Sequence, residues 1–101
     1  MNSVSITGIV PCFNASETLR EVITSLHNQT PPLQEIIVID DGSTDASSSI
    51  AKDMKCRVIT LEQNIGRGQS RNIGISECRT TYALFCDSTN ILPSNFSANA
   101  I

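Results

Sequence analysis

Two adjacent carboxylates, Asp40 and Asp41, follow an uninterrupted apolar run in the sequence. Like charges this close repel each other, so the pair costs stability unless hydrogen-bond donors or a ligand compensate. Carboxylates at such a place can accept hydrogen bonds from a base N–H or from ribose hydroxyls. A plain turn is the alternative, in which Gly42 allows a permissive backbone and one of residues 43–45 caps the next helix. The position directly after an apolar run favours ligand binding.

A second candidate is the segment 64–72, NIGRGQSRN, which combines two glycines with two arginines. It is not a dinucleotide fingerprint, because Arg71 stands where the third glycine belongs, and it lacks the Gly-Lys-Ser/Thr of a P-loop. At the start of a helix, its free N–H groups and its arginines suit an anion such as a diphosphate. A flexible connection with solvated arginines is the alternative interpretation.

The third cluster is Asp87-Ser88-Thr89-Asn90. A pair of carboxylates spaced Asp-x-Asp after a strand holds a divalent cation that also binds a diphosphate, because hard cations prefer oxygen ligands. Here Thr89 takes the second position, and its hydroxyl is a far weaker ligand. The residues alone therefore predict one carboxylate near the site and disfavour a metal site.

The chain has a single histidine, His27, which disfavours a nucleophilic mechanism that needs a histidine as its base. Its place at the end of a helical pattern favours an interaction with the helix dipole over a role as a catalytic base. No second histidine is present to activate a serine or cysteine nucleophile.

The elements that must position these clusters alternate between strand-like and helix-like patterns. Asn14 and Glu17 suggest a capping box for the first helix. We expect strands over 4–10, 35–39, 57–61 and 82–86, and helices from 14 to the prolines at 31–32, over 45–54, over 68–78 and over 93–101. This order predicts an α/β fold with right-handed βαβ units on a parallel sheet. Ligands bind beyond the carboxyl ends of such strands, so the clusters at 11–14, 40–41 and 87–89 should converge on one crevice.

Length and charge narrow the function classes further. The 101 residues predict a single domain, 1–101, and the net charge of −3 provides no basic face for nucleic acid. No apolar run approaches the roughly 18–20 residues of a membrane span. The N-terminus lacks the pattern of a secretory signal, and the four cysteines match no zinc or redox spacing, so we expect a cytoplasmic protein with reduced thiols.

The motifs together resemble family 2 glycosyltransferases of the GT-A fold. The similarity lies in residues 4–14 (VSITGIVPCFN), 25–30, 35–45 (EIIVIDDGSTD), 64–74 and 85–93, in the order and spacing of the family. Each motif is weak alone, but the ordered set is specific and covers nearly the whole chain. The resemblance implies a Rossmann-like parallel sheet with flanking helices that binds a nucleotide-diphosphate sugar, with a UDP-sugar as the expected donor.

The resemblance also implies roles for individual residues. Pro11, Phe13 and Asn14 would line the nucleoside pocket, with Phe13 against the base. Asp41, together with Asp40, would hold the base or the ribose.

Further along the chain, Arg71 would lie near the nucleotide, and Asp87 matches the first carboxylate of the Asp-x-Asp motif, near the ribose and the metal. The family's second carboxylate is usually the direct ligand of Mn²⁺ or Mg²⁺. Thr89 departs from the family at this position, which puts metal binding in doubt.

A second departure is length, because family members continue into an acceptor-binding half that supplies the catalytic base for inverting transfer. We therefore expect residues 1–101 to be the nucleotide-binding half, with no catalytic base assignable and little activity alone. Three hypotheses remain: part of an inverting transferase, a degenerate nucleotide-binding module, or a structural fragment that associates with itself or with a missing half. In the third case, this association would cover an exposed edge or face of the sheet.

Overall fold

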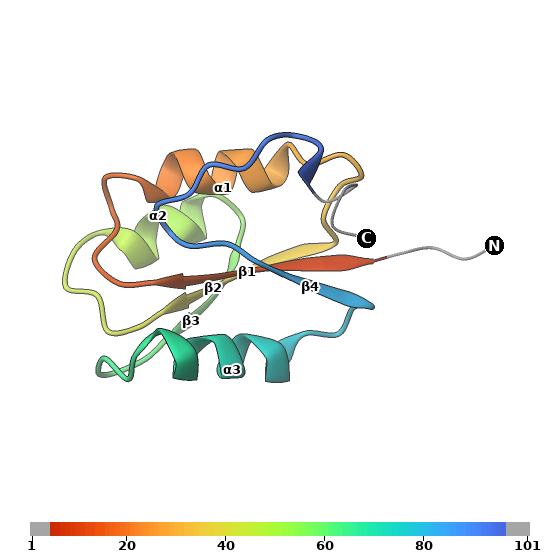
Figure 1. Cartoon of the computed structure of the whole chain (residues 1–101). Coiled ribbons are helices and arrows are strands. Elements are labelled where there is room, and N and C mark those ends of the chain that lie inside the picture. The colour runs from red at the N-terminus through yellow and green to blue at the C-terminus, as the bar shows by residue number, and fades with distance from the viewer. Residues whose placement is uncertain (1–4, 97–101) are drawn as a thin grey trace.

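The computed structural model describes residues 5–96, in which strands and helices alternate along the chain (Figure 1). The elements are β1 Ile6–Cys12, α1 Leu19–His27, β2 Glu35–Asp40, α2 Ser47–Asp53, β3 Arg57–Thr60, α3 Arg67–Glu77 and β4 Tyr82–Phe85. The expected order of elements is confirmed. Of the helix expected over 93–101, the structure describes only a turn at 94–95 and one helical residue, Phe96. The rest of that helix lies outside the described residues.

The four strands form one parallel sheet in the order β3-β2-β1-β4. The chain passes from β1 to β2 and β3 in one direction and then returns to place β4 on the other side of β1. The strand order therefore reverses between β1 and β4, and ligands of open α/β sheets bind beyond the carboxyl ends of the strands at such a point. Figure 1 shows α1 and α2 on one face of the sheet and α3 on the other. The expected α/β, Rossmann-like fold is confirmed.

The core is aliphatic and lies on both faces of the sheet. On one face, Leu19, Val22, Ile23 and Leu26 of α1 are buried, which matches their helical spacing. On the other face, Ile9, Ile37 and Ile39 form a smaller cluster against which Ile73 of α3 packs. Both β1 and β2 are covered on both sides, which accounts for the continuous apolar run of β2, residues 36–39.

The first helix begins later than the sequence indicates. Its N-cap is Thr18, which makes no side-chain capping bond, so the capping box expected at Asn14 and Glu17 is wrong. Asn14 instead adopts a left-handed backbone (φ 49°), and its Oδ1 accepts a hydrogen bond from the backbone N–H of Thr44 at 2.8 Å. Asn14 therefore ties the β1–α1 loop to the β2–α2 loop.

The first strand also extends beyond its expected end at residue 10. It reaches Cys12, whose carbonyl oxygen accepts the N–H of Asp41 at 2.8 Å. Parallel pairing with β2 thus continues to the edge where the polar loops begin. Within residues 5–96, none of the helices has the length and apolar character needed to cross a membrane.

Candidate functional site

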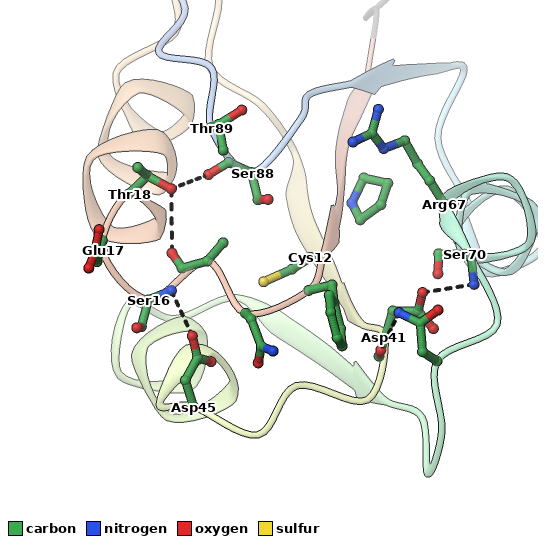
Figure 2. A pocket seen from close by; sticks show the side chains of 16 residues that line it. Cys12, Ser16, Glu17, Thr18, Asp41, Asp45, Arg67, Ser70, Ser88 and Thr89 are labelled. Atoms are coloured by element: carbon green, nitrogen blue, oxygen red, sulfur yellow. Dashed lines mark hydrogen bonds between the residues drawn. The ribbon is translucent and has the colours of Figure 1, made fainter.

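A cavity of about 630 Å³ opens at the carboxyl ends of the strands, beside the point where their order reverses (Figure 2). Four loops that are distant in sequence, together with the first turn of α3, form its walls. They contribute residues 11–18, then Asp41 and Asp45, then Asn64, Gly66, Arg67 and Ser70, and finally Ser88 and Thr89. The clusters at 11–14, 40–41 and 87–89 thus each contribute to one cavity, as expected for parallel βαβ units, although Asp40 and Asp87 do not line it.

Asp41 is the buried carboxylate of the cavity wall, with only 3% of its surface exposed. Its Oδ1 accepts the N–H of Ile65 at 2.7 Å, and its Oδ2 accepts the N–H of Gly66 at 3.0 Å. These residues immediately precede α3, so the carboxylate lies near the positive end of that helix. The sequence predicts that free N–H groups at the start of this helix bind a diphosphate, but two N–H groups there already donate to Asp41. Each carboxylate oxygen keeps a second lone pair for a further donor.

Asp40 has a different role from its neighbour. It is also buried, but its Oδ1 accepts the backbone N–H of Ser43 at 3.0 Å, and it is not among the residues that line the cavity. The turn that it stabilises needs Gly42, whose φ of +77° favours glycine. The turn interpretation therefore applies to Asp40, which holds the turn. The ligand-binding interpretation remains for Asp41, which faces the cavity.

Asp45 joins two of the loops that surround the cavity. Its Oδ1 accepts hydrogen bonds from the hydroxyl of Ser47 at 2.6 Å and from the N–H of Ser47 at 3.0 Å. Its Oδ2 accepts the N–H of Ser16, at 3.1 Å, from the β1–α1 loop. These bonds, above all the one from the Ser47 hydroxyl, lower the pKa of Asp45 to about 2.

This pKa predicts a pH dependence of stability. Because the pKa in the folded chain lies below the ordinary value of 3.8, the stabilisation is complete above about pH 4 and is lost as the pH falls towards 2. Asp45→Asn is expected to be less stable than the wild type at pH 5, with a difference that shrinks as the pH approaches 2. Urea unfolding of both chains between pH 2 and 5 measures this difference, and a difference independent of pH would contradict it.

Arg71 and Asp87 lie side by side at the rim of the site. Nη2 of Arg71 is 3.6 Å from Oδ1 of Asp87, and its guanidinium carbon lies 5.5 Å from the centre of the Phe85 ring. Nη1 of Arg67 approaches the same Asp87 oxygen at 4.0 Å. Arg71 and Asp87 are not among the cavity-lining residues, whereas Arg67 is. The carboxylate of Asp87 thus lies close to two guanidinium groups.

The donor set around Asp87 does not fit a resident Mn²⁺ or Mg²⁺ ion. These cations prefer several oxygen ligands, with carboxylates foremost. Thr89 offers only a hydroxyl, and burial raises the pKa of the Cys86 thiol to about 11, which keeps it protonated. Among residues 5–96, the structure contains no cluster of three His, Cys, Asp or Glu side chains arranged to hold a metal. The two guanidinium groups at Asp87 would also repel a cation.

Four of the residues expected at the site line the cavity: Pro11, Phe13, Asn14 and Asp41. Arg67 and Asn64 belong to the segment singled out as an anion loop, but nothing in that pattern separated them from their neighbours. Ser70 belongs to the same segment, and its buried Oγ finds no hydrogen-bond partner within the described part of the chain. Contact of any of these residues with a ligand is still a prediction.

Thr18 is another residue that the sequence did not single out. Its hydroxyl donates to the carbonyl oxygen of Ser88 at 2.7 Å, which joins the start of α1 to the loop after β4 (Figure 2). This bond fixes one wall of the cavity against another.

Comparisons with known proteins match this architecture. A model of the family "Glycosyl transferase family 2" matches residues 7–96. The glycosyltransferase GlyA of Streptococcus pneumoniae serotype 4 is 38% identical over 95 residues, which cover 90% of this chain and 14% of GlyA.

Solved structures show the same similarity. The structure of S. aureus TarS 1-349 in complex with UDP has a TM-score of 0.88 at 29% identity, covering 96% of this chain and 31% of TarS. Glucosyl-3-phosphoglycerate synthase from Mycobacterium tuberculosis, in complex with Mn²⁺, UDP and glucosyl-3-phosphoglycerate, has a TM-score of 0.72 at 27% identity, covering 84% of this chain and 33% of the synthase. The chain thus spans a third or less of each of these proteins. Since the family model matches 7–96 and the fold agrees, the chain belongs to glycosyl transferase family 2.

Proposed function

We propose that the cavity binds the nucleoside diphosphate of a nucleotide-sugar donor, with a UDP-sugar as the donor class. The observation that carries the proposal is the cavity at the reversal of strand order, which is lined by both a buried carboxylate and an exposed aromatic ring. TarS, which shares the fold, was solved in complex with UDP and with UDP-GlcNAc. Because the chain spans about a third of such proteins, the transfer of the sugar is proposed for the whole protein.

The nucleoside would lie between Phe13 and Asp41. Half of the Phe13 surface is exposed although its side chain lines the cavity, and a free aromatic face is suited to stack against a base. Asp41 is a pure acceptor with lone pairs to spare, so it matches a base N–H or a ribose hydroxyl. A carboxylate at that depth also repels a phosphate, so we place the diphosphate away from Asp41, nearer to the loop after β4.

Calorimetric titration with UDP and UDP-GlcNAc tests the proposal. We expect saturable one-site binding of both, and weaker binding by Phe13→Ala because the stacking surface is removed. Phe96→Ala is the matched control, because Phe96 is also partly exposed but does not line the cavity. The absence of UDP binding by the wild-type chain would refute the proposal, and equal effects of the two variants would refute the placement of the base.

A non-catalytic nucleotide-binding module is a second candidate function. The observation that favours it is Thr89, which stands where the resemblance implies a metal-binding carboxylate. Incubation of the chain with UDP-GlcNAc tests the second candidate. Release of UDP above the rate without protein would contradict the module and support the transferase.

Self-association through β4 is a further role that we propose, alongside nucleotide binding. β4 is at an edge of the sheet, and Tyr82 and Phe85 expose 46% and 38% of their surface there. Such an edge favours pairing with a second chain. Sedimentation velocity over a range of concentrations tests this, and a single monomeric species at the highest concentration would contradict it.

A further inference from the structure

Arg67 is the first residue of α3, and its side chain lines the cavity. Figure 2 shows it extending from α3 towards the side of the cavity where Ser88 and Thr89 lie. Its side chain is 67% exposed, and its ion pair with Asp87 is long, at 4.0 Å. The guanidinium is therefore held only loosely and can turn towards a ligand at little cost.

Acidic side chains outnumber basic ones among the residues that line the cavity. Among the cavity-lining residues of the described chain, Arg67 is the single cationic side chain, whereas Glu17, Asp41 and Asp45 are acidic. At the rim, Asp87 has two arginines beside it, Arg67 and Arg71, so one of them can leave while the carboxylate keeps the other. A diphosphate brought to this side of the cavity needs positive charge, and the guanidinium of Arg67 supplies it.

We propose that Arg67 binds the diphosphate of the donor in the place of a divalent cation, so that nucleotide binding by this chain does not depend on metal. This inference rests on the proposed function. A guanidinium presents a planar fork of N–H donors that matches two phosphate oxygens. When Arg67 turns to the diphosphate, Asp87 keeps Arg71, which lies 3.6 Å away.

Thr89 fits the same arrangement. A carboxylate at this position would need a bridging cation to bind a phosphate oxygen. The hydroxyl of Thr89 can donate a hydrogen bond to that oxygen directly. Thr89, which replaces the metal-binding carboxylate of the family, therefore supplies an uncharged hydrogen-bond donor at the cavity wall, opposite the guanidinium of Arg67.

Calorimetric titrations of UDP and of uridine, each in EDTA and in Mn²⁺, test the inference. For the wild-type chain, we expect the Kd of UDP to differ less than about twofold between EDTA and Mn²⁺. Arg67→Ala is expected to weaken UDP binding about tenfold or more, as for the loss of a charged hydrogen bond, and to leave uridine binding unchanged. Arg79→Ala is the matched control, since it removes the same charge from a residue that does not line the cavity.

The possible results separate the inference from the proposed function. UDP binding that strengthens several-fold with Mn²⁺ would overturn the inference and leave the proposed function intact. The same holds if Arg67→Ala binds UDP as well as Arg79→Ala does, or if it loses uridine and UDP equally. If the wild-type chain binds UDP neither in EDTA nor in Mn²⁺, both fail.

Discussion

Gly74→Ala is expected to lower the free energy of unfolding by about 2–3 kcal/mol, as overpacking of a close-packed core does. A Cβ at Gly74 would lie 2.4 Å from Cγ2 of Ile9, closer than two carbon atoms can approach. Ile9 is fully buried in β1, a central strand between β2 and β4, so its side chain cannot swing out into solvent. The gain in helix propensity from glycine to alanine, about 1 kcal/mol, is too small to compensate for this clash.

Gly68→Ala is the control for this prediction. Gly68 lies in the same helix, but a Cβ there would meet nothing within 4 Å. This variant should therefore be as stable as the wild type or more stable by up to about 1 kcal/mol. Urea unfolding of the three chains measures the difference. Equal stability of both variants would show that α3 does not approach β1 as closely as described.

Asp41→Asn is expected to lower the free energy of unfolding by about 1–3 kcal/mol and to weaken UDP binding in the same variant. The carboxylate accepts one N–H on each oxygen, from Ile65 and from Gly66. An asparagine has a single acceptor oxygen, and its NH₂ group would face one of these N–H groups. One of these part-buried N–H groups would then lose its acceptor, and the β3–α3 loop would lose one of its attachments to the end of β2.

Asp53→Asn is the matched control, because it makes the same change of charge at an exposed position of α2. Its stability should stay within about 0.5 kcal/mol of the wild type. Urea unfolding and calorimetric titration of UDP should be carried out on both variants. If Asp41→Asn matches Asp53→Asn in both measurements, Asp41 neither stabilises the β3–α3 loop nor contributes to UDP binding.

Local patterns were enough to predict the order of elements. The β-branched run at 36–39 and the helical spacing of Leu19, Val22, Ile23 and Leu26 are each properties of a few neighbouring residues. Element ends were less predictable, because they depend on partners elsewhere in the chain. β1 continues to Cys12 because Asp41 bonds to it, and α1 starts late because Asn14 bonds to Thr44.

The candidate site was predictable to the level of its loops but not of its bonds. Parallel topology brings strand ends together, so the convergence of the clusters follows from the order of elements. The different roles of Asp40 and Asp41 do not follow from the order of elements, because they depend on hydrogen bonds to the turn at Ser43 and to the loop at residues 65–66. The pairing of Arg67 with Asp87 likewise joins residues 20 positions apart, and no local pattern signals it.

The central claim is that a nucleoside diphosphate binds in the cavity at the carboxyl ends of the strands. The most direct measurement is a ¹H–¹⁵N NMR titration of the labelled chain with UDP. We expect the largest amide shifts at Asn14, Asp41 and Gly66 and small shifts at Lys55 and Arg79, which lie away from the cavity. Shifts that concentrate around Lys55 or Arg79, or no shifts at saturating UDP, would contradict the claim.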